Sequence, residues 1–375
     1  MSLSLPADPP AARSLTALLP QLILALEGRS GWFAPASSAI VLVVDGLGAH
    51  NLAARSGHAR FLAGAGGRRD TARTVFPSTT ATALTSLLTG RAAGEHGIVG
   101  YRALEPGRDL VLNQLRGWDT DALPVTWQRA QPLLESEAAA GRPCFVVSKH
   151  EYAGTGFTEA TMRGAQFHGA RELDERMRLA AGLAQQHPGA LIYLYAPELD
   201  AVGHKHGWES DRWTAALESV DAAVRLLAET ADPGTGIVVT ADHGMIDVPR
   251  HRQILLSDGD RLVAGVRHIG GEPRMLHLYA EPGAADDLLA AWRAAESARS
   301  WVLGRGEAVE AGLFGDVDPA VLPRIGDVLV AARAGVAYYD DRLDDKAPQK
   351  MVGQHGSLTG EERIVPLLRL GAFAA

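Results

Sequence analysis

The sequence predicts an α/β fold with a mostly parallel central sheet, helices on both faces of that sheet, and a smaller inserted α+β subdomain. Apolar, β-branched runs alternate with helix-patterned segments along the N-terminal part of the chain. This alternation is typical of a parallel sheet whose strands are buried on both faces. Beyond residue 246 the alternation of strand and helix patterns ends, and short strand patterns follow one another more closely. The change indicates the inserted subdomain.

Composition and charge exclude several classes of function. The 375 residues carry a formal net charge of −8, so we expect no basic surface for nucleic acid. The only cysteine, Cys144, excludes an internal disulfide and a cysteine-based metal cluster. The apolar run Leu15–Leu26 lacks a preceding basic segment and is too short to cross a bilayer. We therefore expect a soluble, cytoplasmic protein without a membrane partner, and the oligomeric state stays open.

The expected elements fall into three parts. Residues 1–30 form a loose tail (Met1–Ala12) and then a helix that packs on the main domain. The main domain, residues 31–246 with 346–375, has expected strands at Ala39–Val44, Cys144–Ser148, Ala190–Tyr195 and Gly236–Thr240 and expected helices at His50–Ala63, Ala170–Gln186 and Asp211–Thr230. The subdomain, residues 247–345, has expected strands at Arg261–Val266, Arg274–Tyr279, Asp327–Ala332 and Gly335–Tyr338 and an expected helix at Ala284–Ser297.

The segment Thr74–Gly90 combines a strand, a turn and a helix. Thr74–Phe76 reads as a short strand that Pro77 ends, and helical spacing of apolar residues follows. Hydroxyl side chains stand where this helix is expected to begin, namely Ser78, Thr79 and Thr80. The free backbone N–H groups of a helix start can bind a phosphate. Capping of the helix alone would select the same residue types.

Ionisable residues follow the expected strands of the main domain. They are Asp45 after the first strand, Asp200 and His204 after the third, Asp242 and His243 after the fourth, and His355 between two glycines near the C-terminus. Each of them alone also fits a turn or an ion pair. In an open α/β sheet, however, ligands bind at the carboxyl ends of the strands. We therefore expect these side chains to form one site.

The residue types at this site indicate a metal centre. Carboxylates with imidazoles and no thiolate suit Zn²⁺ first and Mn²⁺ second. Two such ions about 4 Å apart can clamp a phosphoryl group while one of them activates a nucleophile. The sequence therefore predicts two divalent ions beside the hydroxyl-rich turn.

The motifs together resemble the alkaline phosphatase superfamily, in the branch of nucleotide pyrophosphatases and type I phosphodiesterases. The matching segments are VVDGLG at 43–48, PSTTATALTSLLTG at 77–90, EHGIVGY at 95–101, DAVGHKHG at 200–207, TADHGM at 240–245 and QHG at 354–356. Their order and separation agree with that family over nearly the whole main domain.

The resemblance implies a role for each residue of the expected site. Asp45, Thr80, Asp242 and His243 resemble one metal site, and Asp200, His204 and His355 resemble the other. In the family the nucleophile lies nine residues before the threonine of a closing Thr-Gly pair, so the pair Thr89-Gly90 selects Thr80 as the nucleophile, with Thr79 as the alternative. The implied reaction is phosphoryl transfer through a phospho-threonine intermediate.

Two further positions are compared with the family. Tyr101 stands where phosphodiesterases of this branch usually carry an asparagine that hydrogen-bonds the substrate, and a phenol can also donate one hydrogen bond. Lys149 resembles a substrate-binding lysine of phosphonoacetate hydrolases in the same superfamily. Both residues are therefore candidates for substrate binding.

The sequence thus predicts a two-metal hydrolase of phosphodiester or pyrophosphate bonds in small, nucleotide-type substrates. The alternative within the same chemistry is a phosphomonoesterase or a phosphonate hydrolase, and a more distant one is an inactive metal-binding protein. A sulfatase is excluded because Cys144 is followed by Phe-Val-Val and not by the Cys-x-Pro-x-Arg pattern.

Overall fold

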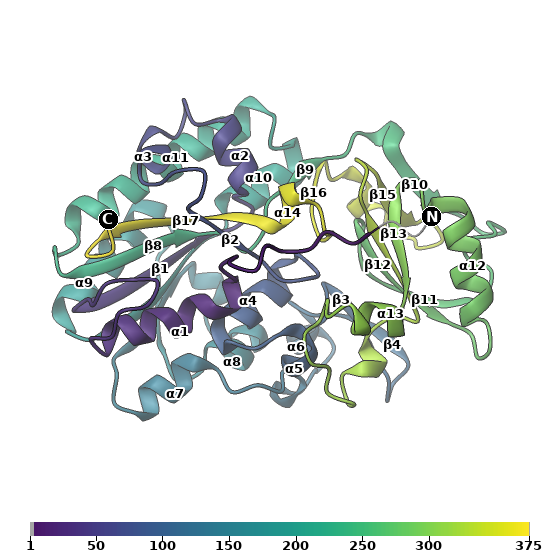
Figure 1. The fold of residues 1–375 in the computed structure, drawn as a ribbon, viewed down its shortest axis with the longest axis horizontal. Coiled ribbons are helices and arrows are strands. Elements are labelled where there is room, and N and C mark those ends of the chain that lie inside the picture. The colour runs from purple at the N-terminus through teal and green to yellow at the C-terminus, as the bar shows by residue number, and fades with distance from the viewer. Residues whose placement is uncertain (1–3, 375) are drawn as a thin grey trace.

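A seven-stranded sheet forms the centre of the computed structural model, which describes residues 4–374 (Figure 1). Its order is β2-β17-β8-β1-β7-β5-β6, with bounds Thr71–Arg73, Ile364–Gly371, Thr235–Thr240, Ser38–Val44, Leu191–Ala196, Cys144–Ser148 and Gln166–Gly169. The strands from β8 to β6 are parallel, whereas β17 pairs antiparallel with both β8 and β2. The predicted mostly parallel sheet is confirmed.

Helices cover both faces of this sheet (Figure 1). One layer contains α1 (Leu15–Leu26), α4 (Thr80–Thr89), α7 (Leu133–Ala139) and α8 (Gly156–Met162). The other contains α2 (Ala49–Ala54), α3 (Arg60–Gly64), α9 (Leu173–Gln186), α10 (Glu198–His206) and α11 (Asp211–Thr230). Every residue of β1 is buried between the two layers, which explains why this strand is apolar throughout.

A second, antiparallel sheet lies at the right of Figure 1. Its order is β11-β12-β14-β13, with bounds Val266–Glu272, Met275–Ala280, Val328–Ala332 and Ser300–Gly304. Helices α12 (Ala285–Glu296) and α13 (Arg305–Glu310) accompany it. Trp292, Leu278 and Val330 belong to an apolar core of its own. This unit corresponds to the expected α+β subdomain.

Shorter elements connect the two sheets. The paired strands are β3 (Arg102–Glu105) with β4 (Leu110–Asn113), β10 (Gln253–Leu256) with β15 (Ala337–Asp340), and β9 (Ile246–Asp247) with β16 (Gly353–Gln354). The remaining helices are α5 (Ala93–His96), α6 (Gly117–Thr120), α14 (Gly360–Arg363) and 3₁₀ turns at Val125–Trp127, His150–Tyr152, Arg250–Arg252, Leu322–Arg324 and Ala347–Lys350. The β9–β16 pair joins the two ends of the segment that carries the second sheet.

Three elements differ from the sequence-based expectation. The strand expected over Thr74–Phe76 forms earlier, as β2, where β17 offers a pairing edge. The helix expected over His50–Ala63 is divided into α2 and α3 by turns around Gly57. The strand expected over Arg261–Val266 begins only at its last residue, because Asp260 accepts a hydrogen bond from a following backbone N–H and closes a turn there.

Leu5 and Asp8 in the N-terminal segment contact the rest of the chain. The first residues of the expected loose tail, 1–3, lie outside the described residues. Residues 4–12 contain no described helix or strand, but Leu5 packs against the cluster of Phe76 and Phe314. Asp8 accepts a 2.8 Å hydrogen bond from Arg363. Among residues 4–374 no helix combines the length and the apolar character that crossing a membrane would need.

Candidate active site

Three carboxylates gather beyond the carboxyl ends of three neighbouring strands. Strands β8, β1 and β7 are adjacent in the sheet, and Asp242, Asp45 and Asp200 follow them in the sequence. Asp45 and Asp242 are buried, while Asp200 is half-buried at the start of α10. The sheet order therefore brings together residues that are far apart along the chain, as the strand-end argument predicted.

The loop after β1 approaches its neighbours closely. Asp242 Oδ1 accepts hydrogen bonds from the backbone N–H groups of Gly46 (3.2 Å) and His243 (3.0 Å). Gly46 has φ +75°, and a Cβ atom there would lie 3.2 Å from Cα of Asp200. Only glycine combines this backbone conformation with so close an approach. The Tyr195 hydroxyl donates to Asp45 Oδ2 and fixes that carboxylate from the strand side.

Each of the three histidines has its Nδ1 nitrogen at a backbone carbonyl oxygen. The pairs are His204 with Gly353 (2.8 Å), His243 with Gly244 (3.1 Å) and His355 with Ser78 (3.0 Å). A donated Nδ1–H leaves Nε2 with a free lone pair, which is the arrangement of metal-binding histidines. The rings of His243 and His355 stack at a centroid distance of 3.5 Å.

His355 reaches the site through two strand-like contacts. The short pair β9–β16 returns the chain from the second sheet and places Gln354 opposite Ile246. An isolated antiparallel bridge then joins Gly356 to Ser78. These contacts fix His355 between the turn after β8 and the turn before α4.

The buried carboxylates of this cluster need positive charge beside them to be stable in their ionised form. Burial and the neighbouring Asp242 and Asp200 raise the pKa of Asp45 well above its usual range. Burial and the neighbouring imidazoles of His243 and His204 hold the pKa of His355 well below its usual range. Within residues 4–374, the buried oxygens Asp45 Oδ1, Asp200 Oδ1 and Asp242 Oδ2 have no hydrogen-bond partner. Such acceptors are costly to bury alone.

The donor atoms fall into two overlapping groups. Asp45, Asp242 and His243 form one, and Asp200, His243 and His355 form the other, with the ligand atoms of each group within 4.8 Å of one another. His204 Nε2 lies 3.2 Å from Asp200 Oδ1, so the predicted i,i+4 pair does share a helical face. Carboxylate and imidazole donors without thiolate fit divalent ions of the Zn²⁺ type.

The hydroxyls before α4 have different surroundings. Thr80 is the first residue of the helix, and its Oγ1 lies 3.2 Å from His243 Nε2. Ser78 donates to the carbonyl oxygen of Ser357 (2.7 Å). Thr79 is buried and faces the carboxyl group of Glu272. Of the three hydroxyls, that of Thr80 therefore points to the acid–imidazole cluster.

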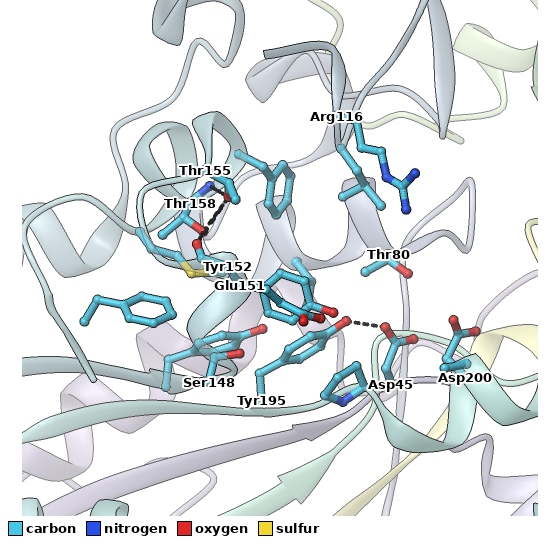
Figure 2. A pocket seen from close by; sticks show the side chains of 18 of the residues that line it. Asp45, Thr80, Arg116, Ser148, Glu151, Tyr152, Thr155, Thr158, Tyr195 and Asp200 are labelled. Carbon is cyan, nitrogen blue, oxygen red and sulfur yellow. Dashed lines mark hydrogen bonds between the residues drawn. The ribbon is translucent and has the colours of Figure 1, made fainter. Parts of the chain in front are cut away.

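A cavity of about 500 Å³ opens from Thr80 along the sheet. Figure 2 shows Thr80, Asp45 and Asp200 at one end, with Tyr195 and Ser148 along the floor and Arg116 above Thr80. Its apolar walls include Leu84, Tyr152, Phe157, Met162, Phe167 and Tyr193. All lining residues among those described come from the main domain and none from 247–345.

The two candidate substrate-binding residues lie outside this lining, as far as residues 4–374 are concerned. Lys149 Nζ lies 3.6 Å from Glu198 Oε1, which also accepts from Arg176. Tyr101 is half-buried, and its carbonyl oxygen accepts a hydrogen bond from Gln114 (2.7 Å). Their roles in substrate binding stay predictions.

Sequence reasoning missed several residues of the site. Tyr193 and Tyr195 alternate on β7 and so share one face of the sheet, a pattern that could have placed both beside Asp45. Arg116 gave no such signal, because a loop brings it to the pocket.

A sequence model of one family matches most of the chain. The family is described as type I phosphodiesterase / nucleotide pyrophosphatase, and the match covers residues 39–358. The chain belongs to this family. The resemblance drawn from the motifs, within the alkaline phosphatase superfamily, is thereby confirmed.

Curated relatives of this member of the type I phosphodiesterase family match the chain over only a part of their own length. An uncharacterized pyrophosphatase/phosphodiesterase of Schizosaccharomyces pombe is 26% identical over 196 residues, 49% of this chain and 39% of that protein. Human ectonucleotide pyrophosphatase/phosphodiesterase family member 7 is 25% identical over 178 residues, 44% of this chain and 38% of that protein. The chain thus spans less than two fifths of the length of these curated relatives.

Solved structures share the fold. Murine ectonucleotide pyrophosphatase / phosphodiesterase 5 has a TM-score of 0.70 at 19% identity, covering 89% of this chain and 88% of that chain. Phosphonoacetate hydrolase from Sinorhizobium meliloti, in complex with phosphonoformate, has a TM-score of 0.69 at 20% identity, covering 90% and 91%. At these identities the likeness establishes the alkaline phosphatase-like fold.

Proposed function

We propose that this chain is a two-metal hydrolase that cleaves phosphodiester or pyrophosphate bonds of nucleotide-type substrates through a phospho-threonine intermediate on Thr80. The main support is the position of the Thr80 hydroxyl. Its Oγ1 lies 3.2 Å from His243 Nε2, beside the two groups of carboxylate and imidazole side chains, and at one end of a pocket. Family membership supports the reaction class. A structure of an inactive variant of murine ectonucleotide pyrophosphatase / phosphodiesterase 5 in complex with AMP supports the substrate class.

The proposed ligand sets follow the two sides of the cluster. One divalent ion would be held by Asp45, Asp242, His243 and the Thr80 hydroxyl, and the other by Asp200, His204 and His355. Such ions, Zn²⁺ as first choice and Mn²⁺ as second, would lower the pKa of the hydroxyl and neutralise charge on the phosphoryl oxygens.

The chain's own groups bind the substrate and supply the nucleophile. Thr80 Oγ1 loses its proton to solvent and attacks phosphorus as the bond to the leaving oxygen breaks. A water oxygen later attacks phosphorus, the P–Oγ1 bond breaks, and a proton from that water restores the hydroxyl. The first turn of α4 offers backbone N–H groups to the non-bridging oxygens. The carbonyl partners of the histidine Nδ1 atoms keep the imidazole rings oriented during both steps.

The pocket favours a diester over a monoester. A phosphodiester carries a second organic group, and the apolar cavity that begins at Thr80 has room for it. A monoester carries an extra negative charge and would gain from the ammonium group of Lys149, but Glu198 engages that group outside the pocket lining. Phosphomonoester or phosphonate hydrolysis is kept as the alternative because of the fold shared with phosphonoacetate hydrolase.

Parallel assays test the proposal. The purified protein should turn over bis(p-nitrophenyl) phosphate and the p-nitrophenyl ester of thymidine 5′-phosphate faster than p-nitrophenyl phosphate or phosphonoacetate. Chelation should abolish this activity, and Zn²⁺ or Mn²⁺ should restore it. A preference for p-nitrophenyl phosphate or phosphonoacetate would support the alternative instead. Bound ions without turnover of any substrate would indicate an inactive metal-binding protein.

A further inference from the structure

Two buried hydroxyl groups at the inner end of the pocket lack partners within residues 4–374. Ser148 ends β5 and is 3% exposed, and Tyr193 lies on β7 and is 1% exposed. Neither Ser148 Oγ nor the Tyr193 hydroxyl has a hydrogen bond to another described residue. Both residues line the same cavity as Thr80. Buried polar groups nearly always have a hydrogen-bond partner, so two hydroxyl groups without one in the same pocket need an explanation.

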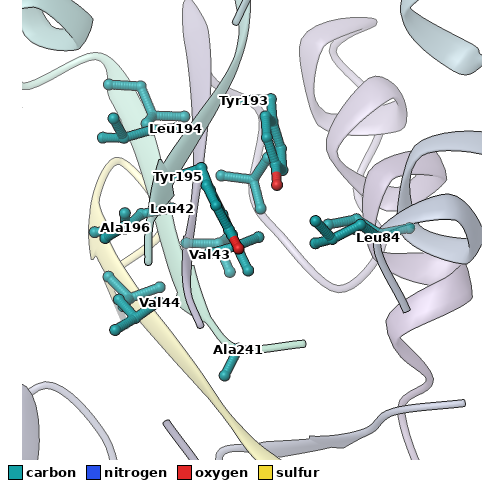
Figure 3. Close-up of a cluster of buried hydrophobic side chains, with 14 of the residues drawn as sticks. Leu42, Val43, Val44, Leu84, Tyr193, Leu194, Tyr195, Ala196 and Ala241 are labelled. Carbon is teal, nitrogen blue, oxygen red and sulfur yellow. The ribbon is translucent and has the colours of Figure 1, made fainter. Parts of the chain in front are cut away.

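Strand pairing places the two hydroxyls on the same face of the sheet. Strands β5 and β7 are parallel neighbours, with Val146 opposite Tyr193. Ser148 is two residues after Val146, so its side chain points to the same face. Figure 3 shows the Tyr193 and Tyr195 rings side by side, both directed toward Leu84 on α4. The hydroxyls therefore belong to the pocket floor, under the helix that begins with Thr80.

Much of the remaining inner end is apolar, and the hydroxyls of Thr155 and Thr158 in the same lining already donate to the carbonyl oxygen of Tyr152. The apolar walls are the side chains of Leu84, Phe157, Met162 and Phe167. Burial, with the nearby Asp242 and Asp45, raises the pKa of the Tyr193 phenol well above its usual range, so the group stays a neutral donor and acceptor. A flat group with apolar faces and a hydrogen-bonding edge would satisfy both the walls and the hydroxyls.

We propose that this inner end binds the organic substituent of the substrate and that Ser148 Oγ and the Tyr193 hydroxyl hydrogen-bond its polar edge. The pair selects a heteroaromatic ring over a carbocyclic ring of similar size, because a site built for hydrogen bonds rejects an analogue that lacks them. The inference rests on the proposed function, since Thr80 at the other end of the cavity defines where the phosphoryl group lies.

Two matched substrates test the selection. The p-nitrophenyl phosphodiesters of 2-(uracil-1-yl)ethanol and of 2-phenylethanol share the leaving group and the linker and differ in the ring. The wild-type protein should favour the uracil diester in kcat/KM by roughly tenfold or more. Tyr193→Phe and Ser148→Ala should each lower this ratio several-fold, because they slow the uracil diester more than the phenyl diester.

Thr82→Val is the matched control. Thr82 also carries a buried hydroxyl without a partner in the described chain, but it does not line the pocket. Its variant should leave the ratio unchanged. A wild-type ratio near one, or an equal loss for both diesters in Tyr193→Phe and Ser148→Ala, would overturn the inference. The Ser148→Ala result and the wild-type ratio remain decisive if Tyr193→Phe fails to fold.

A binding measurement separates this inference from the proposed function. If the wild-type protein hydrolyses neither diester, the proposed function is wrong. Calorimetry with 2-(uracil-1-yl)ethyl phosphate and 2-phenylethyl phosphate then still decides the inference. Tighter binding of the uracil compound, lost in Ser148→Ala, would support it, and equal binding of the two compounds would refute it.

Discussion

Two neighbouring threonines begin α4, and their surroundings give them different roles. Thr80 Oγ1 faces His243 at 3.2 Å, whereas Thr79 is buried against Glu272 in the second sheet. The backbone at Thr79 is extended, as at a helix N-cap, but within the described residues its side chain makes no capping hydrogen bond. The hydroxyl that we propose as the nucleophile is the one at the first helical position, where backbone N–H groups are also free.

Thr80→Ala should remove the covalent intermediate. We expect kcat to fall by about 10³-fold or more, at least as much as the loss of one oxyanion-hole donor. Thr79→Ala should keep most of the activity and cost less than about 1 kcal/mol of stability, because no cap bond is lost. Acid trapping of the phospho-enzyme and peptide mass spectrometry would locate the phosphate. Its appearance on Thr79 would show that the assignment is wrong.

Metal content should depend on single ligands. Elemental analysis of the purified chain should give close to two divalent ions, and Asp242→Ala and His204→Ala should each lose roughly one. His206→Ala is a control on the same helix, because His206 is half-buried and its Nε2 contacts Arg212 (2.9 Å) instead of the acid cluster. Wild-type stoichiometry in both ligand variants would contradict the assignment.

Glu272 should make stability depend on pH. Burial raises its pKa from 4.5 to about 8, against the opposing effect of the Thr79 hydroxyl. Because the folded-state value exceeds the unfolded-state one, this group stabilises the fold fully below about pH 4.5. The contribution is lost as the pH rises through about 8.

Glu272→Gln keeps the shape of the protonated side chain and removes its titration. Urea unfolding at pH 6, 7, 8 and 9 should show the variant gaining stability relative to the wild-type chain as the pH rises. A constant difference across this range would mean that Glu272 does not titrate there.

At the scale of elements, a buried ion pair joins the second sheet to the C-terminal segment. Arg274, in the turn between β11 and β12, makes two 2.8 Å hydrogen bonds to Glu362 in α14, and both side chains are 0% exposed. Glu362 also accepts from the backbone N–H of Ser357 (3.0 Å). The segment that carries His355 is therefore braced from the subdomain side.

Arg274→Ala should destabilise the fold by about 3–5 kcal/mol, because it leaves the Glu362 carboxylate buried without its partner. Arg267→Ala is the control within the same sheet. Arg267 pairs with Asp109 at a partly exposed site, so its loss should cost below about 1 kcal/mol. Denaturant unfolding of the two variants measures the difference, and similar losses would argue against the bracing role.

At the scale of the whole molecule, the pocket lies on the first sheet, whereas the Arg274–Glu362 ion pair extends from the second sheet. The described residues that line the pocket all belong to the main domain, so the subdomain supports the site rather than enclosing the substrate. A shared apolar cluster joins Phe76 and Val99 of the main domain to Met275 and Leu329 of the subdomain. The division at residues 247–345 remains a prediction about the chain, and this cluster implies that the two parts unfold together.

Hydrogen exchange in increasing urea should therefore show one cooperative transition. Peptides from β1 and from β14 should lose protection at the same urea concentration, because the shared cluster and the Arg274–Glu362 pair couple the two cores. Loss of protection in β14 at clearly lower urea, with β1 intact, would show a subdomain that unfolds independently.

Much of the fold could be predicted because its signals are local. The apolar run of β1 and the amphipathic pattern of α11 follow from burial on two faces and on one face. The predicted bounds were wrong where contacts with distant segments determine the secondary structure. Residues Thr71–Arg73 form a strand because β17 pairs with them, and α3 begins where Asp221 accepts its first backbone N–H groups.

The sequence by itself determined the sheet, the metal-type donors and the turn that holds the proposed nucleophile, because each depends on residues close together in the chain or on strand ends that must meet. Only the tertiary structure decided which threonine faces the histidines, where Lys149 pairs, and that Ser148 and Tyr193 share a pocket floor. These outcomes depend on side-chain direction and on contacts between distant segments. No local sequence pattern specifies these contacts, because the same residue types would fit other contacts until the sheets pack together.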